Sequence, residues 1–407
     1  MGLSLQEENY LKILYINGMG PVKKASLSGI FVSQRILALK KLGVQIVPVN
    51  ARLVYSYVLQ LLRRLKRISD NGKLLSQQLN IDYYVITVKV NLYDILKARI
   101  SPTAYKKVLK RDLYSRLKMV DADVIHLHWC WPVGLILPEL AAKQGIPYVL
   151  TFHGSDINIQ LQNPTVKPVM LDIMENAASV EFVSQALLDR AIVSGYSGEN
   201  AIVIYNGIDT DTFYRKPDQD RDKDRHKCVG FVGNLLPVKG ADRLPEIFSR
   251  IMVSYKDELD FIVVGQGDLA EKLKEQMESL PVTFTGQLSP KQLSDIYNRM
   301  DVLVVPSRNE GYSCVIKEAQ ACGVIPVGCD VGGIGEAVGL YGSVVPVVQE
   351  DELCGQLAGR VVDYLEGKFT INLEEMAFEA EKCSWTARQK ESLRNYEQIL
   401  LNSLSKN

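Results

Sequence analysis

The sequence predicts an α/β protein with two doubly wound, Rossmann-like domains facing each other across a cleft. Short Val- and Ile-rich runs alternate with amphipathic segments of helix length along the chain. A polar segment rich in helix- and strand-breaking residues, RKPDQDRDKDRHK at 215–227, interrupts this alternation once, after which it resumes. The length of 407 residues also exceeds what one ordinary domain of about 100–200 residues contains.

The first half of the chain begins with KILYIN (12–17), an expected strand, and continues after a loop with the amphipathic segment 30–43, which ends on a glycine. Further strands are expected at 44–49, 123–129, 147–153, 179–184 and 201–206. A strand, a helix and another strand in this order are typical of parallel sheets.

After the interruption, strands are expected at 228–233, 260–265, 282–286, 301–307, 324–329 and 343–347. Their unbroken apolar runs suit strands that are buried on both faces. We therefore predict an N-terminal domain over 1–214, a linker over 215–227 and a C-terminal domain over 228–384. Ligands of such folds bind beyond the carboxyl ends of the strands, so the predicted active site lies in the cleft between the domains.

Composition favours a cytoplasmic enzyme. Hydrophobic residues make up 47% and charged residues 23% of the chain, as in soluble globular proteins. No apolar run reaches the roughly 18 residues of a membrane span, and the N-terminus lacks the layout of a secretory signal. The seven cysteines are scattered and form no Cys-x-x-Cys pair, which indicates a reducing compartment.

The net charge of zero conceals an asymmetry between the halves. Residues 1–216 contain 26 Lys and Arg against 17 Asp and Glu, and most of the excess lies in 52–118, with 15 basic and four acidic residues. Within it, the segment 53–68 places apolar residues on one helical stripe at 54, 58, 61, 62, 65 and 68, with basic residues at 63, 64, 66 and 67. Two interpretations stay open: a helix packed on the core with solvated charges, or a helix that contacts an anionic membrane surface or acceptor. Nucleic acid is not expected, because no basic motif interleaved with aromatic residues is present.

Two glutamates stand eight positions apart in PSRNEGYSCVIKEAQACG (306–323). A helix is expected from near Ser313 to Gly323, with Glu310 in the preceding loop and Glu318 about one and a half turns inside the helix. The free backbone N–H groups between them favour an anion. This arrangement suits a ligand with a phosphate flanked by hydroxyls, such as a nucleotide sugar.

Two further polar residues follow expected strands. Lys239 lies in the loop of FVGNLLPVKG (231–240), where a lysine either neutralises a diphosphate or is simply solvated. His153 ends a buried strand in TFHGSD (151–156), and it is either a functional residue or a hydrogen-bonded structural one.

Four other motifs have simpler interpretations. VVGQGDLA (263–270) fits a dinucleotide fingerprint, but the next strand ends without the required acid, so a tight turn is favoured. DTD (209–211) follows a strand without a third metal ligand, so a turn is favoured over a metal site, while DAD (121–123) precedes its strand. GYSCV (311–315) is excluded as a hydrolase nucleophile, because no histidine follows it.

Four features occur in the order FHGSD, VGNLLPVKG, VVGQGDL and PSRNEGYSCVIKEAQACG, followed by two glycines and Glu336. In this combination the sequence resembles the family-4 retaining glycosyltransferases, two-domain enzymes of GT-B fold that carry an E-x7-E motif. The resemblance spans most of the chain, and the C-terminal half is the more specific part.

The resemblance implies a role for each candidate residue. Glu318 would hold the ribose hydroxyls of the donor, and Glu310 the donor sugar. The amides of Gly311, Tyr312, Ser313 and Cys314 would cradle the sugar and diphosphate. Lys239 would clamp the diphosphate, and His153 would contact the sugar that is transferred. The resemblance also implies that a last helix over 385–404 crosses back onto the N-terminal domain and completes it.

Two positions depart from the family pattern. Asn234 stands where arginine is usual, so one positive charge is missing near the diphosphate. The first loop has Ser28-Gly29 instead of two glycines, which leaves Gly29 as the residue expected to approach the phosphates.

The resemblance implies a retaining hexosyl transfer without metal or cofactor, from a UDP-sugar in preference to GDP-mannose. The expected acceptor is a saccharide, lipid-linked in bacterial surface polysaccharide synthesis, with peripheral association at the inner membrane face. Three alternatives stay open: transfer to a soluble small molecule or protein, a nucleotide-sugar epimerase of similar fold, and a non-catalytic sugar-binding protein.

Overall fold

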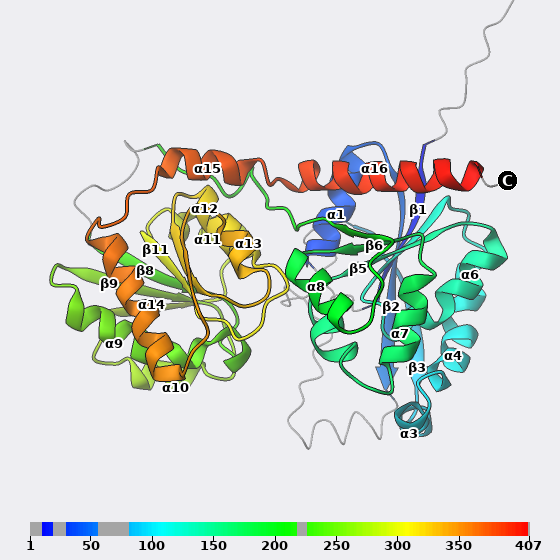
Figure 1. Cartoon of the computed structure of the whole chain (residues 1–407), viewed down its shortest axis with the longest axis horizontal. Helices are drawn as coiled ribbons and strands as arrows, with labels where there is room; N and C mark the ends of the chain where they lie inside the picture. The colour runs from blue at the N-terminus through cyan, green and yellow to red at the C-terminus, as the bar shows by residue number, and fades with distance from the viewer. Residues whose placement is uncertain (1–9, 19–29, 56–80, 218–225, 406–407) are drawn as a thin grey trace, which may run out of the picture. The chain divides into compact units, whose positions relative to one another are not determined.

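The computed structural model describes residues 10–18, 30–55, 81–217 and 226–405. The chain divides into two compact units, one made of 1–205 with 388–407 and the other of 206–387. Each unit contains one parallel sheet (Figure 1). The predicted class, an α/β protein with two Rossmann-like sheets, is therefore confirmed. Most of the predicted linker lies in 218–225, outside the described residues, so the predicted domain boundaries stay a prediction.

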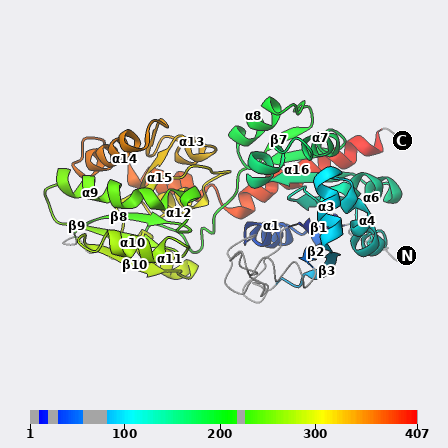
Figure 2. The same ribbon diagram turned by 90° about the horizontal axis from the view of Figure 1, so that it is seen from below.

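The first unit is built on a seven-stranded sheet in the order β3-β2-β1-β4-β5-β6-β7. Its strands are β1 (Lys12–Asn17), β2 (Gln45–Tyr55), β3 (Tyr84–Val90), β4 (Val124–His128), β5 (Tyr148–Phe152), β6 (Ser179–Phe182) and β7 (Ala201–Val203). Its helices are α1 (Ile30–Lys41), α3 (Leu92–Ile100), α4 (Ala104–Leu109), α5 (Ser115–Leu117), α6 (Leu137–Gln144), α7 (Lys167–Glu175), α8 (Gln185–Val193) and, from residue 388 on, α16 (Trp385–Leu404). Helices cover both faces of the sheet (Figure 2), which explains why β1, β4, β5 and β6 are buried along almost their whole length.

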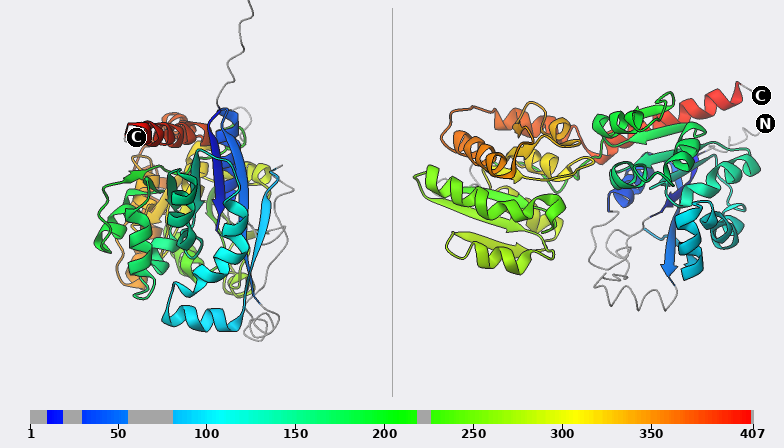
Figure 3. Two further views of the ribbon diagram at one scale, coloured as in Figure 1. Left: turned by 90° about the vertical axis from the view of Figure 1, so that its right-hand side faces the viewer. Right: turned by 60° about the horizontal axis from the view of Figure 1, so that its bottom comes forward.

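The second unit has a six-stranded sheet in the order β10-β9-β8-β11-β12-β13. Its strands are β8 (Lys227–Val232), β9 (Leu259–Val264), β10 (Val282–Gly286), β11 (Val302–Val305), β12 (Ile325–Cys329) and β13 (Ser343–Val345). Its helices are α9 (Leu244–Ser254), α10 (Ala270–Gln276), α11 (Pro290–Tyr297), α12 (Cys314–Ala321), α13 (Ile334–Val338), α14 (Glu350–Leu365) and α15 (Leu373–Glu381). Figure 3 shows helices on both faces of this sheet as well. In the core, Phe248 of α9 stacks on Phe261 of β9 with ring centroids 4.3 Å apart.

The end of the chain completes the core of the first unit. Tyr396 and Ile399 of α16 are buried in one cluster with Ile13, Val32 and Leu39. Tyr396 also hydrogen-bonds to the buried His126. Helix α16 is therefore an integral part of the first unit.

A buried ion pair lies beneath α16. Arg35 of α1 and Glu181 of β6 are both fully buried, with 2.9 Å between Nη1 and Oε2. The Thr151 hydroxyl also donates to Glu181, at 3.0 Å. His126 bridges Thr151 at 2.6 Å and the Tyr396 hydroxyl at 2.5 Å. Removing one member would leave a buried charge without its partner, which is strongly destabilising.

For residues 44–118 the start of the predicted helix was wrong, and one strand was not predicted. The expected helical stripe began at residue 53, but β2 continues through Tyr55, so Val54 belongs to a strand. The other stripe positions and the basic residues at 63, 64, 66 and 67 lie outside the described residues. Strand β3 was not predicted: it is the edge strand of the sheet, and its alternating burial gives a weaker apolar signal than that of a central strand.

Candidate active site

Two loops at the carboxyl edge of the second sheet carry most of the predicted site residues. The loop after β11 leads through Glu310 to Ser313, the N-cap residue of α12, and the helix ends just before Gly323 as predicted. Ser313 is 3% exposed, and its hydroxyl has no hydrogen-bond partner among the described residues. The helix N-terminus, with this hydroxyl and its free amides, is suited to bind an anion.

The second loop, after β8, brings Lys239 to Glu310. Lys239 ends a short 3-10 turn (Pro237–Lys239), and its Nζ lies 2.6 Å from Oε1 of Glu310. The Ser307 hydroxyl donates to the same oxygen at 3.4 Å. Gly240 makes this approach of the two loops possible: its φ is +67°, and a Cβ there would lie 1.8 Å from the carbonyl oxygen of Pro306.

Glu318 projects from the fifth position of α12 and contacts the buried Tyr297, whose hydroxyl donates to Oε2 at 3.3 Å. Burial raises the pKa of Glu318 to about 7, although the Tyr297 hydrogen bond lowers it and the negative charge of Asp209 raises it further. The carboxyl group thus titrates in the neutral range, where a small change of environment alters its charge.

Most of the remaining predicted donor residues lie close to these two loops in the sequence. Gly311 and Tyr312 are buried in the turn before α12, and burial raises the pKa of the Cys314 thiol, which stays neutral at the helix N-terminus. Asn234 is exposed in the loop after β8. Gly29 lies outside the described residues, so its role stays a prediction.

An arginine network that the sequence did not predict fixes the two loops together. Arg308 binds Asp242 with both guanidinium nitrogens, at 2.7 and 2.9 Å, and reaches Glu350 at 2.9 Å. Arg243 donates to the Pro306 carbonyl at 2.7 Å and to Glu350 at 2.7 and 2.8 Å. Arginine suits this bridging role because its planar fork presents several donors at once. No local pattern marks these residues, because their partners lie far away in the sequence.

The glycine motif after β9 forms a tight turn that supports the Lys239 loop. Gly265 has a φ of +134°, and a Cβ there would lie 1.9 Å from the carbonyl oxygen of Gly233. The amide of Leu235 donates to the Gln266 carbonyl at 2.9 Å, and that of Leu269 donates to the Leu235 carbonyl at 3.2 Å. The motif therefore places one loop against another, in agreement with the favoured interpretation.

The two aspartate pairs have structural roles. Asp209 accepts hydrogen bonds within its own turn, from the Asp211 amide at 3.3 Å and the Thr212 hydroxyl at 2.8 Å. Asp123 accepts from the Lys12 amide at 2.7 Å, and Asp121 pairs with the Lys12 side chain at 3.0 Å. In the part of the chain that the structure describes, no group of three or more His, Cys, Asp or Glu side chains is arranged to hold a metal ion.

His153 lies at the carboxyl edge of the first sheet. Asp156 accepts hydrogen bonds from the backbone of His153 at 3.2 Å and of Gly154 at 2.9 Å, which holds the FHGSD loop. The His153 ring contacts His128, with 2.8 Å between Nε2 and Nδ1 of His128. Sequence reasoning missed His128, although the alternation in DVIHLHW puts both of its histidines on one face of the strand.

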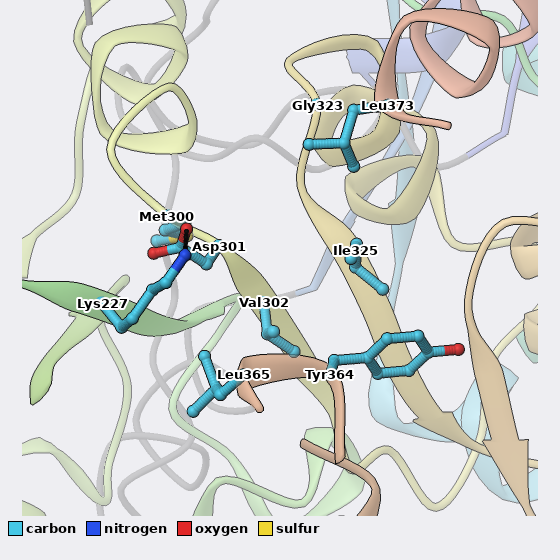
Figure 4. A pocket seen from close by; sticks show the side chains of 9 residues that line it. All are labelled: Lys227, Met300, Asp301, Val302, Gly323, Ile325, Tyr364, Leu365 and Leu373. Atoms are coloured by element: carbon cyan, nitrogen blue, oxygen red, sulfur yellow. Dashed lines mark hydrogen bonds and ion pairs between the residues drawn. The ribbon is translucent and has the colours of Figure 1, made fainter. Parts of the chain in front are cut away.

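A cavity of about 120 Å³ lies elsewhere in the second unit (Figure 4). It is lined by Lys227, Met300, Asp301, Val302, Gly323, Ile325, Tyr364, Leu365 and Leu373. Several of these residues begin strands, so the cavity opens at the amino edge of the sheet, whereas Lys239 and Glu310 follow strand ends. Ligands of open α/β sheets bind at the carboxyl edge, and we do not assign this cavity to the active site.

Two protein-family models match the chain. The model described as Glycosyl transferases group 1 matches residues 226–363, and the model described as Glycosyltransferase Family 4 matches residues 57–212. Together with the solved structures below, these matches support a family-4-like glycosyltransferase with the two-domain GT-B fold.

Three curated relatives illustrate the similarity. An uncharacterized glycosyltransferase of Methanocaldococcus jannaschii is 29% identical over 53% of this chain and 58% of its own length. The putative teichuronic acid biosynthesis glycosyltransferase TuaC of Bacillus subtilis is 27% identical over 81% of this chain and 84% of its own length. A phosphatidyl-myo-inositol mannosyltransferase of Mycobacterium tuberculosis is 27% identical over 67% of this chain and 71% of its own length.

Solved structures share the fold. HepE of Anabaena in complex with UDP has a TM-score of 0.70 and 17% identity, over 95% of this chain and 100% of that one. A second HepE structure, with UDP and glucose, has a TM-score of 0.65 and 17% identity, over 96% and 100% of the two chains. At this identity the likeness establishes the fold alone. Among the described residues, no helix is both long and apolar enough to cross a membrane.

Proposed function

We propose that the protein is a retaining, metal-independent glycosyltransferase of the hexosyltransferase type, which moves a sugar from a nucleotide-diphosphate donor to a saccharide acceptor. The contact that carries this proposal is the 2.6 Å pair of Lys239 and Glu310. It puts a cation and a carboxylate beside the N-terminus of α12, with Glu318 farther along the same helix. A nucleotide sugar has matching groups: a diphosphate between two sets of hydroxyls.

Each part of the donor, from the ribose through the diphosphate to the sugar, binds to one of these groups. Glu318 accepts from the ribose hydroxyls, and the amides of 311–314 bind the diphosphate at the positive end of the helix. Lys239 neutralises the leaving phosphate as charge develops on it. Glu310 binds the reacting sugar. The sugar moves by front-face displacement without a covalent enzyme intermediate, and the departing phosphate assists removal of the acceptor proton.

Three measurements test the reaction class. The product should keep the anomeric configuration of the donor, and full activity should persist in excess chelator. Activity that chelator abolishes and magnesium or manganese restores would refute metal independence. Incubation with donor alone should release nucleotide slowly, as water replaces the acceptor; formation of an epimeric donor would instead indicate an isomerase.

A UDP-sugar is the proposed donor, in preference to GDP-mannose. The HepE structures, which share the fold, hold UDP, whereas the residues of β10 and its following loop do not discriminate between bases. A thermal-shift series with UDP, GDP and ADP at equal concentrations identifies the preferred base, because a ligand at 100 times its Kd adds roughly 2.7 kcal/mol of stability. Stabilisation by GDP alone would overturn the choice of base.

We further propose a lipid-linked saccharide acceptor of bacterial surface polysaccharide synthesis, met at the inner membrane surface. Two relatives support this proposal by their names, which refer to teichuronic acid biosynthesis and to phosphatidyl-myo-inositol. In the first unit, α3 exposes Leu92, Tyr93 and Leu96, and Lys97 lies over the Tyr93 ring at 4.4 Å. Apolar and aromatic side chains next to a cation are typical of a surface that enters a lipid interface.

Vesicle binding is the expected consequence. Wild-type protein should sediment with anionic vesicles at low salt and be released at high salt, because each basic residue near an anionic leaflet contributes about 1 kcal/mol. A variant with Arg63, Arg64, Lys66 and Arg67 changed to Gln should stay in the supernatant, while a variant with four exposed basic residues of the second unit changed to Gln should still sediment. Wild-type protein that does not bind anionic vesicles at low salt would contradict the membrane proposal and leave the donor proposal intact.

Donor binding should depend on pH through Glu318. Its pKa of about 7 means that the carboxylate is protonated as pH falls below 7, and the negative charge that strengthens the hydrogen bonds from the ribose hydroxyls is then lost. Calorimetric titration of UDP should therefore give a Kd that rises below pH 7. Glu318→Gln should bind UDP more weakly at pH 8, by about 1.5–3 kcal/mol, with a flatter pH dependence.

Although Glu318→Gln should weaken UDP binding, it should raise the free energy of unfolding of the protein. Because burial raises the pKa of Glu318 above its unfolded value of 4.5, the folded state holds the proton more tightly. Its contribution to the free energy of unfolding therefore falls as pH rises from about 4.5 to 7. The Gln variant should gain stability relative to wild type across that window.

The binding prediction has its own test: equal UDP affinity of wild type and Glu318→Gln at pH 8 would refute the assignment of Glu318 to the ribose.

A further inference from the structure

The loop that carries Glu310 is flanked by two other loops. It spans residues 306–313 and follows β11, which lies between β8 and β12 in the sheet. In a parallel sheet the carboxyl ends of the strands lie at one edge, so the loops that follow β8 and β12 begin on either side of this loop. The Lys239 loop (233–243) lies on one side, and the segment 330–333, which leads into α13, lies on the other. Contacts from both sides therefore set the position of Glu310.

The Lys239 loop holds the first part of the Glu310 loop. The backbone amide of Arg308 donates to the Val238 carbonyl at 2.9 Å, and its guanidinium donates to the Pro237 carbonyl at 2.6 Å. These contacts fix the backbone as far as residue 308. Beyond it, the Lys239 side chain reaches the carboxylate of Glu310 at 2.6 Å, but this contact does not hold the Glu310 backbone.

Gly332 contacts the Glu310 backbone from the other side. Its φ is +52°, in the left-handed region, and a Cβ there would lie 1.9 Å from the carbonyl oxygen of Glu310 and 3.0 Å from the carbonyl carbon. Only a hydrogen atom fits between the Cα of residue 332 and this oxygen. Glycine is thus required twice at this position, once for its φ and once for the close approach of the two backbones.

The segment 330–333 is anchored, whereas the backbone of Glu310 is not. The Asp330 amide donates to the Val345 carbonyl of β13 at 2.8 Å, and Ile334, the first residue of α13, is fully buried. Among the described residues, no hydrogen bond involves the amide or the carbonyl oxygen of Glu310. A Cβ at residue 332 would therefore displace Glu310 more readily than it would displace its own segment.

We propose that Gly332 is a positioning residue for Glu310. Its close approach to the carbonyl group holds the backbone of this glutamate, while Lys239 and Ser307 hold the carboxylate. This inference rests on the proposed function, in which Glu310 binds the reacting sugar. A carboxylate that is held from both sides needs no rearrangement when the sugar arrives, which is the condition for strong electrostatic stabilisation of a transition state.

Gly332→Ala tests the contact. A Cβ does not approach a backbone oxygen within 3.0 Å, so the Glu310 carbonyl would have to move by about 1 Å. A misplacement of about 1 Å can cost roughly 100-fold in rate, and we expect kcat to fall by this factor. The Kd of UDP, which lacks the sugar, should change far less. A kcat equal to that of wild type, or a loss of UDP affinity as large as the loss of kcat, would overturn the proposal.

The rate is measured as UDP released from UDP-glucose, UDP-galactose or UDP-N-acetylglucosamine, with the donor that wild type uses fastest. The control is Gly367→Ala in the same unit: Gly367 has a φ of +71°, but a Cβ there would meet nothing within 4 Å. This variant should lose stability through backbone strain and keep the kcat of wild type. Thermal melts check that each protein is folded.

Gly332→Asn separates the contact from backbone strain. Asparagine tolerates a positive φ better than alanine does, but it brings the same Cβ to the Glu310 carbonyl. The Asn variant should therefore be the more stable of the two and lose as much kcat as Gly332→Ala. Recovery of kcat in the Asn variant would show that strain is responsible. Failure of both Gly332 variants to fold would make the contact a structural one and would equally overturn positioning.

A double variant tests whether Gly332 acts through Glu310. Gly332→Ala combined with Glu310→Gln should have nearly the kcat of Glu310→Gln alone, because the carboxylate that Gly332 positions is already gone; effects on residues in contact are non-additive in this way. A further loss as large as that of Gly332→Ala in the wild-type background would show that Gly332 acts by another route.

Crystal structures separate this inference from the proposed function. Wild type and Gly367→Ala should keep the 2.6 Å contact between Nζ of Lys239 and Oε1 of Glu310, whereas Gly332→Ala should lengthen or lose it. If the protein transfers no sugar but Gly332→Ala separates this pair, the proposed function fails and the positioning role stands. If transfer is confirmed and Gly332→Ala keeps both the pair and the kcat of wild type, only the assignment of Gly332 fails.

Discussion

Replacing Glu310 by glutamine should lower kcat by at least about 100-fold, as the loss of one preorganised electrostatic contact does in other enzymes, and leave UDP binding nearly unchanged. In the structure Glu310 is paired with Lys239 and only 11% of its side chain is exposed, so its charge is held in place by the fold. We assign it to the reacting sugar, which UDP lacks. Steady-state kinetics with the sugar donor measures kcat, and calorimetry with UDP measures the Kd.

The matched control for this prediction is Glu271→Gln. Glu271 also pairs with a lysine, Lys274 at 2.9 Å, but 88% of its side chain is exposed, and a surface pair of this kind contributes little. The control should be active and as stable as wild type. Substantial turnover in Glu310→Gln with weakened UDP binding would show that Glu310 binds the nucleotide and not the sugar.

Replacing Lys239 by alanine should damage both UDP binding and turnover. The loss of a charged hydrogen bond to the diphosphate amounts to about 1.5–3 kcal/mol, or roughly 10- to 150-fold in Kd. The effect should be at the upper end, because Asn234 supplies no charge to the same loop, and because the unpaired Glu310 would then repel the phosphates. Calorimetry with UDP and kcat with the sugar donor measure the two effects.

Two further variants make this prediction specific. Lys239→Ala combined with Glu310→Gln should bind UDP more tightly than Lys239→Ala alone, since the repelling carboxylate is gone; residues in contact are expected to be non-additive in this way. Asn234→Arg should restore part of the affinity of Lys239→Ala by returning a cation to the loop. If Lys239→Ala binds UDP as well as wild type, the lysine does not contact the diphosphate.

The sheets could be predicted because most of their strands are short runs rich in apolar residues. β1, a central strand that is buried along almost its whole length, has the bounds expected from the sequence, and so does the edge strand β10. Strands with a solvent-exposed face lack a continuous apolar run and are harder to predict. β3 is exposed on one face, and β2 runs on through residues 53–55, where a helical spacing of apolar residues coincided with the end of a strand.

The candidate site was predictable to the extent that it is local in sequence. Glu310 and Glu318 lie on one loop and helix, and a start near Ser313 and an end near Gly323 follow from local signals. The contact between Lys239 and Glu310 joins residues 71 positions apart, and only the fold brings them together. The same holds for the arginine network, whose members depend on partners from other loops that no pattern along the chain reveals, whereas the alternation within β4 did indicate the face on which His128 lies.

The place of α16 has a consequence for the order in which the molecule is made. The second unit, 206–387, is inserted in the sequence between two parts of the first. When the ribosome has completed 1–205, His126 still lacks Tyr396 and the core around Ile13 lacks Ile399. Domains usually fold as units, N-terminal first, during synthesis. Here the later domain has all of its residues before the earlier one does, so the nascent N-terminal part waits for the last twenty residues of the chain.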